Sequence, residues 1–252
     1  MIRLWDLAHN TFRETIRDRI LYVILVFALV MIGASALFGT LTVGQDRKIV
    51  LDLGLAAIEL FGVAIAVFVG TSMLFKEIDK RTVYVVLTKP IPRSEFLLGK
   101  FLGLALTLCV LLVLMGAAFV GLAAMKGAYA PELLGAIAMI GLQLLVVMAL
   151  TVFFSTFASP IMSMLFTFCL YLIGHNTETL RALVQKASPA LKVGIEALYY
   201  VLPNLSTFDA KNLAVYGEGV PAGRWLWAVG YGAAYVCALL ATASAIFERK
   251  EF

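Results

Sequence analysis

Residues able to carry chemistry are sparse within the long apolar runs of this 252-residue chain. Glu59 is the one clear carboxylate inside such a run, and Gln143 lies inside another. An ionisable residue within a membrane segment is a candidate functional site because its burial is costly, so both belong to a possible translocation path. A structural hydrogen bond to a neighbouring helix is the preferred interpretation of Glu59. The sequence shows no basic partner for it, and a lone acid makes a poor proton relay.

Enzymatic chemistry has little support in the sequence. The segment Gly33-Ala34-Ser35-Ala36 weakly resembles the nucleophile motif of intramembrane serine proteases. A catalytic serine needs a positioned base, yet neither histidine falls within an apolar run, so a protease is a remote alternative. The chain contains no GxxxxGK[ST] motif for ATP and no HExxH motif or ligand cluster for a metal. We therefore expect no catalytic residue, no metal and no cofactor in this chain.

The composition is that of an all-α integral membrane protein. The chain is 62% hydrophobic and 14% charged, with a mean hydropathy of +0.96, whereas soluble domains are about half apolar and a quarter charged. The net charge of +4 fits orientation signals and contact with lipid headgroups. No basic stripe with interleaved aromatic residues indicates a nucleic-acid partner.

Six apolar runs predict six transmembrane helices in a single domain of residues 1–252, since a spanning helix needs about 20 residues. The runs are residues 20–43, 53–75, 97–125, 133–157, 161–174 and 225–247. The fifth run is the shortest, and only Ala158-Ser159-Pro160 separates it from the fourth. The proline should end one helix and open the next.

Basic residues predict the orientation of these spans. Twelve of the 20 Lys and Arg residues lie on the side that holds both termini and the loop after the second span. That side should be cytoplasmic. Residues 1–19 form a predicted amphipathic helix in the membrane interface, with Trp5 and Phe12 among the acyl chains. Residues 175–224 form the predicted extracytoplasmic amphipathic segment.

The loop after the second span is a charged island, EIDKRTVYVVLTKPIPRSEFLLGK at residues 77–100. Mixed charges at its start indicate a solvated face, and the apolar residues that follow supply a second face. Two prolines then stop any helix. The pattern predicts a short cytoplasmic helix parallel to the membrane, a proline corner and re-entry into the third span. An ordinary cytoplasmic loop is the alternative.

The island resembles the loop between spans two and three of ABC-2 type transporter permeases. The residues that carry the resemblance are Glu77, Lys80, Arg81, Thr82, Leu87, Lys89, Pro90, Ile91, Pro92, Arg93, Phe96, Leu97, Gly99 and Lys100. The sequence is most similar to the branch of permeases for multicopper-enzyme maturation, the nitrous-oxide-reductase accessory type. Arg81 is a departure, because many members have glycine before the threonine.

The resemblance implies a permease subunit of an ATP-binding-cassette exporter or flippase in a bacterial inner membrane. A second permease copy or a homologue would complete the translocation path through the membrane. Separate ATPase subunits would bind the ATP. Residues 76–96, nearly all of them within the island, would then be the coupling loop, through which the ATPase pushes on the spans. The implied coupling residues are Glu77, Asp79, Lys80, Arg81, Thr82, Lys89, Pro90, Pro92 and Arg93.

A secondary transporter or channel that works without an ATPase is the rival interpretation. It would need ion-coupling residues within the spans, and Glu59 is nearly the only one. The resemblance allows lipids, peptides, sulfur species or cell-surface polymers as transported substrates. The absence of a ladder of methionine and histidine residues argues against direct passage of metal ions.

Overall fold

The computed structural model describes residues 2–40, 46–79, 92–177 and 202–249, and every regular element within them is a helix. The predicted all-α class is therefore confirmed. The elements are α1 (Ile2–Ile16), α2 (Arg19–Thr40), α3 (Asp46–Asp79), α5 (Arg93–Met125), α6 (Glu132–Ser155), α7 (Pro160–His175), the 3₁₀ helix η1 (Leu205–Phe208), α10 (Lys211–Tyr216) and α11 (Ala222–Arg249).

Five of these helices are long and apolar enough to cross a membrane, namely α2, α3, α5, α6 and α11. The chain is thus a multi-pass membrane protein. Helix α7 is apolar but has only 16 residues, so the sixth span remains a prediction. The predicted proline break is confirmed, because α6 ends at Ser155 and Pro160 is the first residue of α7.

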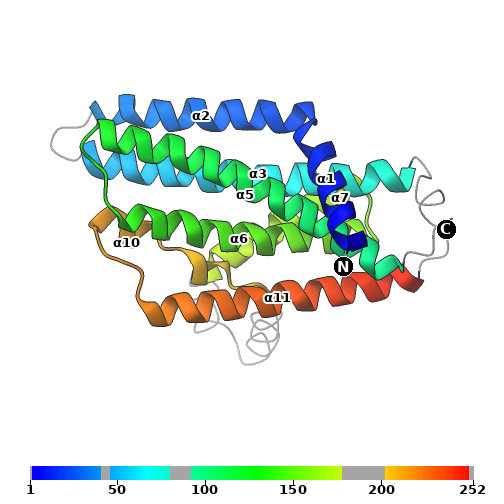
Figure 1. Ribbon diagram of the computed structural model, residues 1–252. Helices are drawn as coiled ribbons and strands as arrows, with labels where there is room; N and C mark the ends of the chain where they lie inside the picture. Colours follow the sequence, from blue (N-terminus) through cyan, green and yellow to red (C-terminus); the bar gives the residue numbers. More distant parts are fainter. Residues whose placement is uncertain (1, 41–45, 80–91, 178–201, 250–252) are drawn as a thin grey trace.

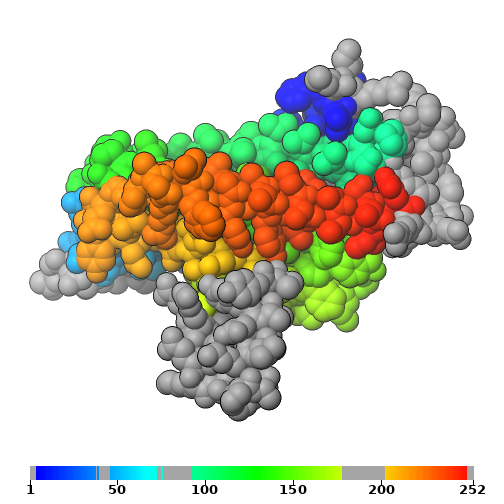
Figure 2. Space-filling model, turned by 90° about the horizontal axis from the view of Figure 1, so that it is seen from below, coloured from blue at the N-terminus to red at the C-terminus, as the bar shows by residue number. Residues whose placement is uncertain are grey.

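The long helices run side by side, and their connections gather at two ends (Figure 1). Helix α1, the last turns of α3, the start of α5 and the end of α11 lie at one end of the bundle. Helix α10 and the start of α3 lie at the other end. Helix α11 extends along one face (Figure 2) and is the least buried of the five long helices. The end of α3 and the start of α5 therefore lie at the opposite end of the bundle from α10 (Figure 1).

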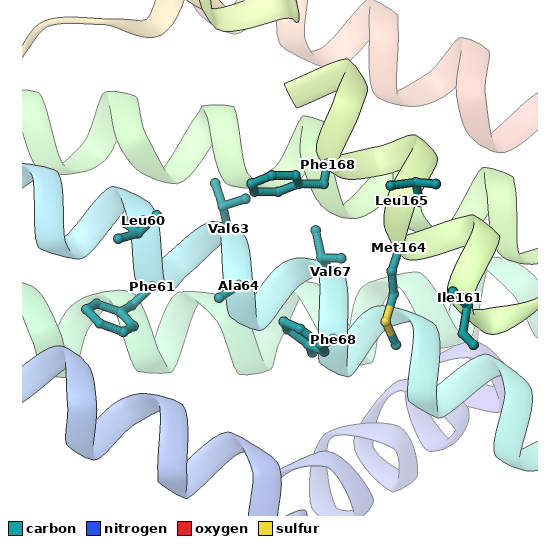
Figure 3. A pocket seen from close by; sticks show the side chains of 10 residues that line it. All are labelled: Leu60, Phe61, Val63, Ala64, Val67, Phe68, Ile161, Met164, Leu165 and Phe168. Atoms are coloured by element: carbon teal, nitrogen blue, oxygen red, sulfur yellow. The ribbon is translucent and has the colours of Figure 1, made fainter. Parts of the chain in front are cut away.

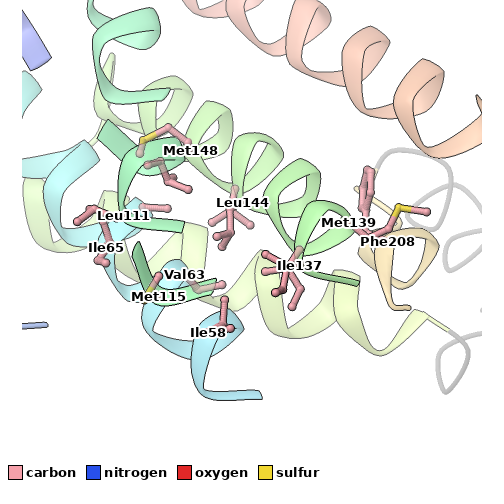
Figure 4. Packing of buried hydrophobic residues seen from close by; sticks show 14 of the residues in the cluster. Ile58, Val63, Ile65, Leu111, Met115, Ile137, Met139, Leu144, Met148 and Phe208 are labelled. Atoms are coloured by element: carbon pink, nitrogen blue, oxygen red, sulfur yellow. The ribbon is translucent and has the colours of Figure 1, made fainter. Parts of the chain in front are cut away.

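Helices α3 and α6 form the centre of the core (Figure 4). Three glycines of α3 let neighbouring helices approach closely. A Cβ at Gly62 would lie 2.5 Å from a methyl carbon of Leu144, and one at Gly70 would lie 3.0 Å from Met148 Sδ. A Cβ at Gly54 would overlap the Phe119 ring of α5. Small residues at such contacts favour association of membrane helices, because packing replaces the hydrophobic effect there.

Helix α1 packs against the first turns of α5. A Cβ at Gly103 would lie 2.5 Å from both Thr11 Cβ and the Ala8 carbonyl oxygen. Lys100 is buried beside this contact, with its Nζ 3.8 Å from Glu14 Oε2. The predicted N-terminal helix is thus present as α1, and it packs on α5. Its location in the membrane interface remains a prediction, although Trp5 is 63% exposed.

The second long helix continues further than its apolar run predicted. The structure has no break at Glu77, and α3 extends through Asp79. The helix can continue because Lys76, Glu77 and Ile78 include no helix breaker, so the ladder of backbone hydrogen bonds is not interrupted. The short surface helix predicted in the island stays a prediction, since residues 80–91 lie outside the described residues. At the other end of the island, α5 begins directly after Pro92, as the prolines predicted.

Candidate functional site

Glu59 is buried inside the bundle, in the first half of α3. It is 3% exposed and occupies the midpoint of the apolar stretch Asp46–Ser72. Because α3 begins at Asp46, Glu59 is 13 residues, or about 20 Å, from the start of its helix. A carboxylate at this depth requires hydrogen bonds or charge partners to offset its lost hydration.

Two neighbouring helices supply hydrogen-bond donors to one oxygen of this carboxylate. Gln143 Nε2 of α6 donates to Glu59 Oε1 at 2.7 Å, and the Tyr171 hydroxyl of α7 donates to the same atom at 3.0 Å. Gln143 was predicted as a path residue from its own polar character. The structure brings it together with Glu59, although 84 residues separate them in sequence.

Glu59 also has basic partners, so the expectation that it lacks one is wrong. Lys211 Nζ donates to Glu59 Oε2 at 2.5 Å, and His175 Nδ1 lies 3.4 Å from Oε1. The sequence did not reveal this pair because Lys211 lies 152 residues downstream, in a segment expected to lie outside the membrane. We call Glu59, Gln143, Tyr171, His175 and Lys211 the Glu59 cluster.

Lys211 is carried by residues 202–216, which we call the cap segment. This segment packs against α3, α6 and α7, and Leu205, Phe208, Ala210 and Ala214 are all buried. Asp209 Oδ1 accepts a hydrogen bond from the backbone N–H of Lys211 at 3.2 Å, which fixes the first turn of α10. The cap segment thus places a basic side chain against the buried acid.

The spacing of Leu205 and Phe208 was the available signal for this packing. Residues three apart share one face of a 3₁₀ turn, so the two apolar side chains point to the same side. The part of the expected extracytoplasmic segment that spans residues 178–201 lies outside the described residues. The burial of the cap segment was not anticipated.

The Glu59 cluster can hold opposite charges inside the bundle. A buried ion pair is weak support for stability, because desolvation opposes the attraction of its charges. Hydrogen bonds from Gln143 and Tyr171 offset part of that desolvation. Within the residues that the structure describes, no group of three or more His, Cys, Asp or Glu side chains is arranged to hold a metal ion.

An apolar groove lies beside the cluster, between α3 and α7 (Figure 3). Its volume is about 510 Å³, and its lining includes Leu60, Val67, Met164 and Phe168. Leu60 follows Glu59 directly, and the Phe168 and Tyr171 ring centroids are 6.4 Å apart. Binding pockets commonly measure about 300–1,000 Å³, so the groove is large enough to receive apolar side chains or acyl chains.

Ser35, the candidate of the remote protease alternative, is buried in α2 and donates a hydrogen bond to the Ile32 carbonyl at 2.6 Å. This bond within its own helix is an ordinary structural arrangement for a membrane serine. Ala36 beside it is also buried, and α2 packs extensively on α3. These contacts fit the interpretation that small residues permit close helix packing here.

Four of the nine predicted coupling residues lie in the part of the chain that the structure describes. Glu77 and Asp79 belong to the last turn of α3, while Pro92 precedes and Arg93 begins α5. These four lie at the end of the bundle opposite α10 (Figure 1). The other predicted coupling residues, Lys80, Arg81, Thr82, Lys89 and Pro90, lie outside the described residues.

Replacing Tyr171 with phenylalanine should reduce the unfolding free energy in detergent by about 1.5–3 kcal/mol, because it removes a hydrogen bond to a charged group. The control is Tyr22→Phe on α2, where the residue is 50% exposed and little change is expected. Denaturant unfolding of both variants measures the difference. Equal stability of the two variants would show that the Tyr171 hydroxyl contributes nothing to the Glu59 cluster.

Comparison with known proteins adds a match over nearly the whole chain. A family model described as "ABC-2 family transporter protein" matches residues 5–252. No curated protein matches the sequence. The matched region contains all six apolar runs, the Glu59 cluster and the island. Members of this family are membrane subunits of ABC transporters and normally work with an ATPase subunit. With its helical membrane bundle and this match, the chain belongs to the ABC-2 family of transporter proteins.

Proposed function

We propose that this chain is the permease of an ABC exporter or flippase in a bacterial inner membrane, without an ATP site of its own. A separate ATPase binds ATP and docks on residues 76–96. The observation that carries the proposal is the family match over residues 5–252. The resemblance of the island to the coupling loop of ABC-2 permeases supports the docking site. The same residues support our proposal that the chain belongs to the branch of permeases for multicopper-enzyme maturation.

Helix α3 offers a mechanical link between the docking site and the Glu59 cluster. It is continuous over 34 residues, which corresponds to about 51 Å at 1.5 Å per residue. Glu77 and Asp79 lie near one end of it, and Glu59 lies 20 residues before Asp79 in the same helix. Close packing at Gly62 and Gly70 ties α3 to α6. A push on the island would therefore move α3 and α6 together.

The groove between α3 and α7 is the proposed surface on which the second permease copy packs. Large apolar side chains are exposed along it, among them Leu60 at 55%, Phe68 at 46% and Ile161 at 76%. Packing of a second copy there would cover this face and place two Glu59 clusters on either side of a shared path. A homologue of similar shape could replace the second copy.

A secondary transporter remains the second candidate function. The Glu59 cluster favours it more than the sequence did, because the acid has basic partners in Lys211 and His175. Such a cluster could respond to an ion gradient. ATP turnover separates the two candidates. The ATPase encoded beside this chain should hydrolyse ATP faster in proteoliposomes that contain the chain than in proteoliposomes without it. An unchanged turnover would contradict the permease function.

The proposed topology puts both termini and the island in the cytoplasm. In a background with Cys109, Cys169 and Cys237 replaced by alanine, we expect cysteines at Arg17 and Glu218 to react from opposite sides. Both positions are exposed. Arg17 precedes α2 and Glu218 precedes α11, and these two helices begin at opposite ends of the bundle (Figure 1). An impermeant maleimide added to whole cells should label Glu218→Cys and spare Arg17→Cys. The reverse pattern, or labelling of both, would refute this orientation.

A further inference from the structure

The cap segment is fastened to the bundle by the Lys211–Glu59 ion pair and by several other polar contacts. Thr177 Oγ1 donates to Asn204 Oδ1 at 2.9 Å, and the Asn204 backbone N–H donates to the Tyr231 hydroxyl at 2.8 Å. Arg224 of α11 donates to the Asp209 carbonyl at 2.6 Å. Lys48 of α3 lies over the Tyr216 ring, with its Nζ 4.6 Å from the ring centroid. Among the described ion pairs, Lys211–Glu59 is the one that joins the cap segment to a carboxylate of the bundle.

The two members of this ion pair differ in their access to water. The Lys211 side chain is 18% exposed, whereas the Glu59 side chain is 4% exposed. A lysine near the rim can extend its ammonium group toward water while its stem stays packed. Lys211 is therefore the partner that can leave, and Glu59 is the partner that remains.

Glu59 keeps other partners when Lys211 leaves. Gln143 and Tyr171 both donate to Oε1, and His175 Nδ1 lies 3.4 Å from that atom, while Lys211 holds Oε2. A carboxylate that retains hydrogen-bond donors is less costly to leave buried than one stripped of all partners. Loss of the Lys211 contact would therefore leave Glu59 with its partners on Oε1.

We propose that the Lys211–Glu59 ion pair is a latch that holds the cap segment closed against α3, α6 and α7. Release of the latch lets residues 202–216 move away and opens this end of the bundle. The role in transport rests on the proposed function, in which motion of α3 carries Glu59 relative to α10. The latch itself belongs to the isolated subunit and needs no ATPase for its test.

The close fit of the cap segment makes its release a discrete step. A Cβ at Gly174 would overlap the Pro203 carbonyl oxygen, and a Cβ at Gly232 would lie 3.3 Å from the Phe208 ring. Packing this close does not deform gradually. The segment therefore leaves as a unit once the ion pair is broken, and buried Ala214 becomes accessible with it.

The test measures how fast a maleimide reacts with Ala214→Cys in the purified full chain, in the background without native cysteines. Ala214 is 1% exposed in α10, so the reaction reports opening of the cap segment. Lys211→Met should speed labelling by about tenfold or more, because local opening follows the loss of a charged hydrogen bond. Lys126→Met, at an exposed lysine beyond α5, is the matched control and should leave the rate unchanged.

A neutral pair separates a latch from damage caused by an unpaired buried charge. The double variant Glu59→Gln with Lys211→Met leaves no charge at either position. A latch predicts that its labelling stays fast, whereas charge damage alone predicts a return to the rate of the parent. That return, or an unchanged rate in Lys211→Met, would overturn the proposal. If Lys211→Met yields no folded protein, two other single variants give the same comparison. Glu59→Gln removes the ion pair and should label fast, whereas Lys211→Arg keeps the positive charge and should label slowly.

Discussion

Reversing two charges of the island should abolish capture of the ATPase while the permease still inserts and folds. The variant is Asp79→Arg with Arg81→Asp, which preserves net charge. Juxtaposed like charges cost several kcal/mol at an interface, and each 1.4 kcal/mol changes affinity about tenfold. Exposed ion pairs contribute only about 0–1 kcal/mol to folding. The measurement is the amount of ATPase that co-purifies with a tagged permease, alongside permease yield.

The matched control reverses two exposed charges at the other end of the bundle, with Lys126→Asp and Glu218→Arg. These positions lie in the expected extracytoplasmic parts of the chain, so ATPase capture should equal that of the parent. If the island variant also retains the ATPase at the parental level, residues 76–96 are an ordinary loop. The coupling residues would then have to be sought elsewhere.

Replacing Pro90 and Pro92 with alanine should separate ATP hydrolysis from transport. Pro92 precedes α5 with φ −62° and ψ 142°, an extended conformation that fits the predicted corner before this helix. Alanine favours the helix over proline by about 3 kcal/mol, so α5 could extend into the island and loosen the corner. We expect the ATPase to bind and hydrolyse ATP while transport falls by at least about tenfold, a barrier change of about 1.4 kcal/mol.

Pro131→Ala provides the comparison for this second prediction, because Pro131 precedes α6 at the opposite end with φ −61°. ATP turnover and transport should both stay near the parental values in that variant. Equal transport by the Pro90/Pro92 variant and the parent would show that the corner does not transmit force.

The helices of this protein were largely predictable from the sequence, because five of the six apolar runs are long and polar or proline residues separate the runs. The break at Pro160 is an example, since proline both ends α6 and starts α7. The continuation of α3 through Asp79 was missed. Hydropathy marks where a helix leaves the apolar region and carries no information on whether it continues into water.

The Glu59 cluster was predictable only in part. An acid in an apolar run indicates a functional or hydrogen-bonded site whatever its partners, and Gln143 was identified on the same ground. Lys211 could not be assigned to it, because a contact across 152 residues depends on how the cap segment folds back. Local periodicity describes which face a residue occupies and does not identify the segment that packs on that face.

The central claim is that a separate ATPase drives this permease, and capture of that ATPase tests it most directly. The tagged chain is co-expressed with the ATPase encoded beside it, extracted in mild detergent and separated by gel filtration. The account predicts one complex in which permease and ATPase co-elute in equal amounts and in which ATP turnover exceeds that of the ATPase alone. Elution of the permease without the ATPase, with turnover unchanged on mixing, would contradict the account.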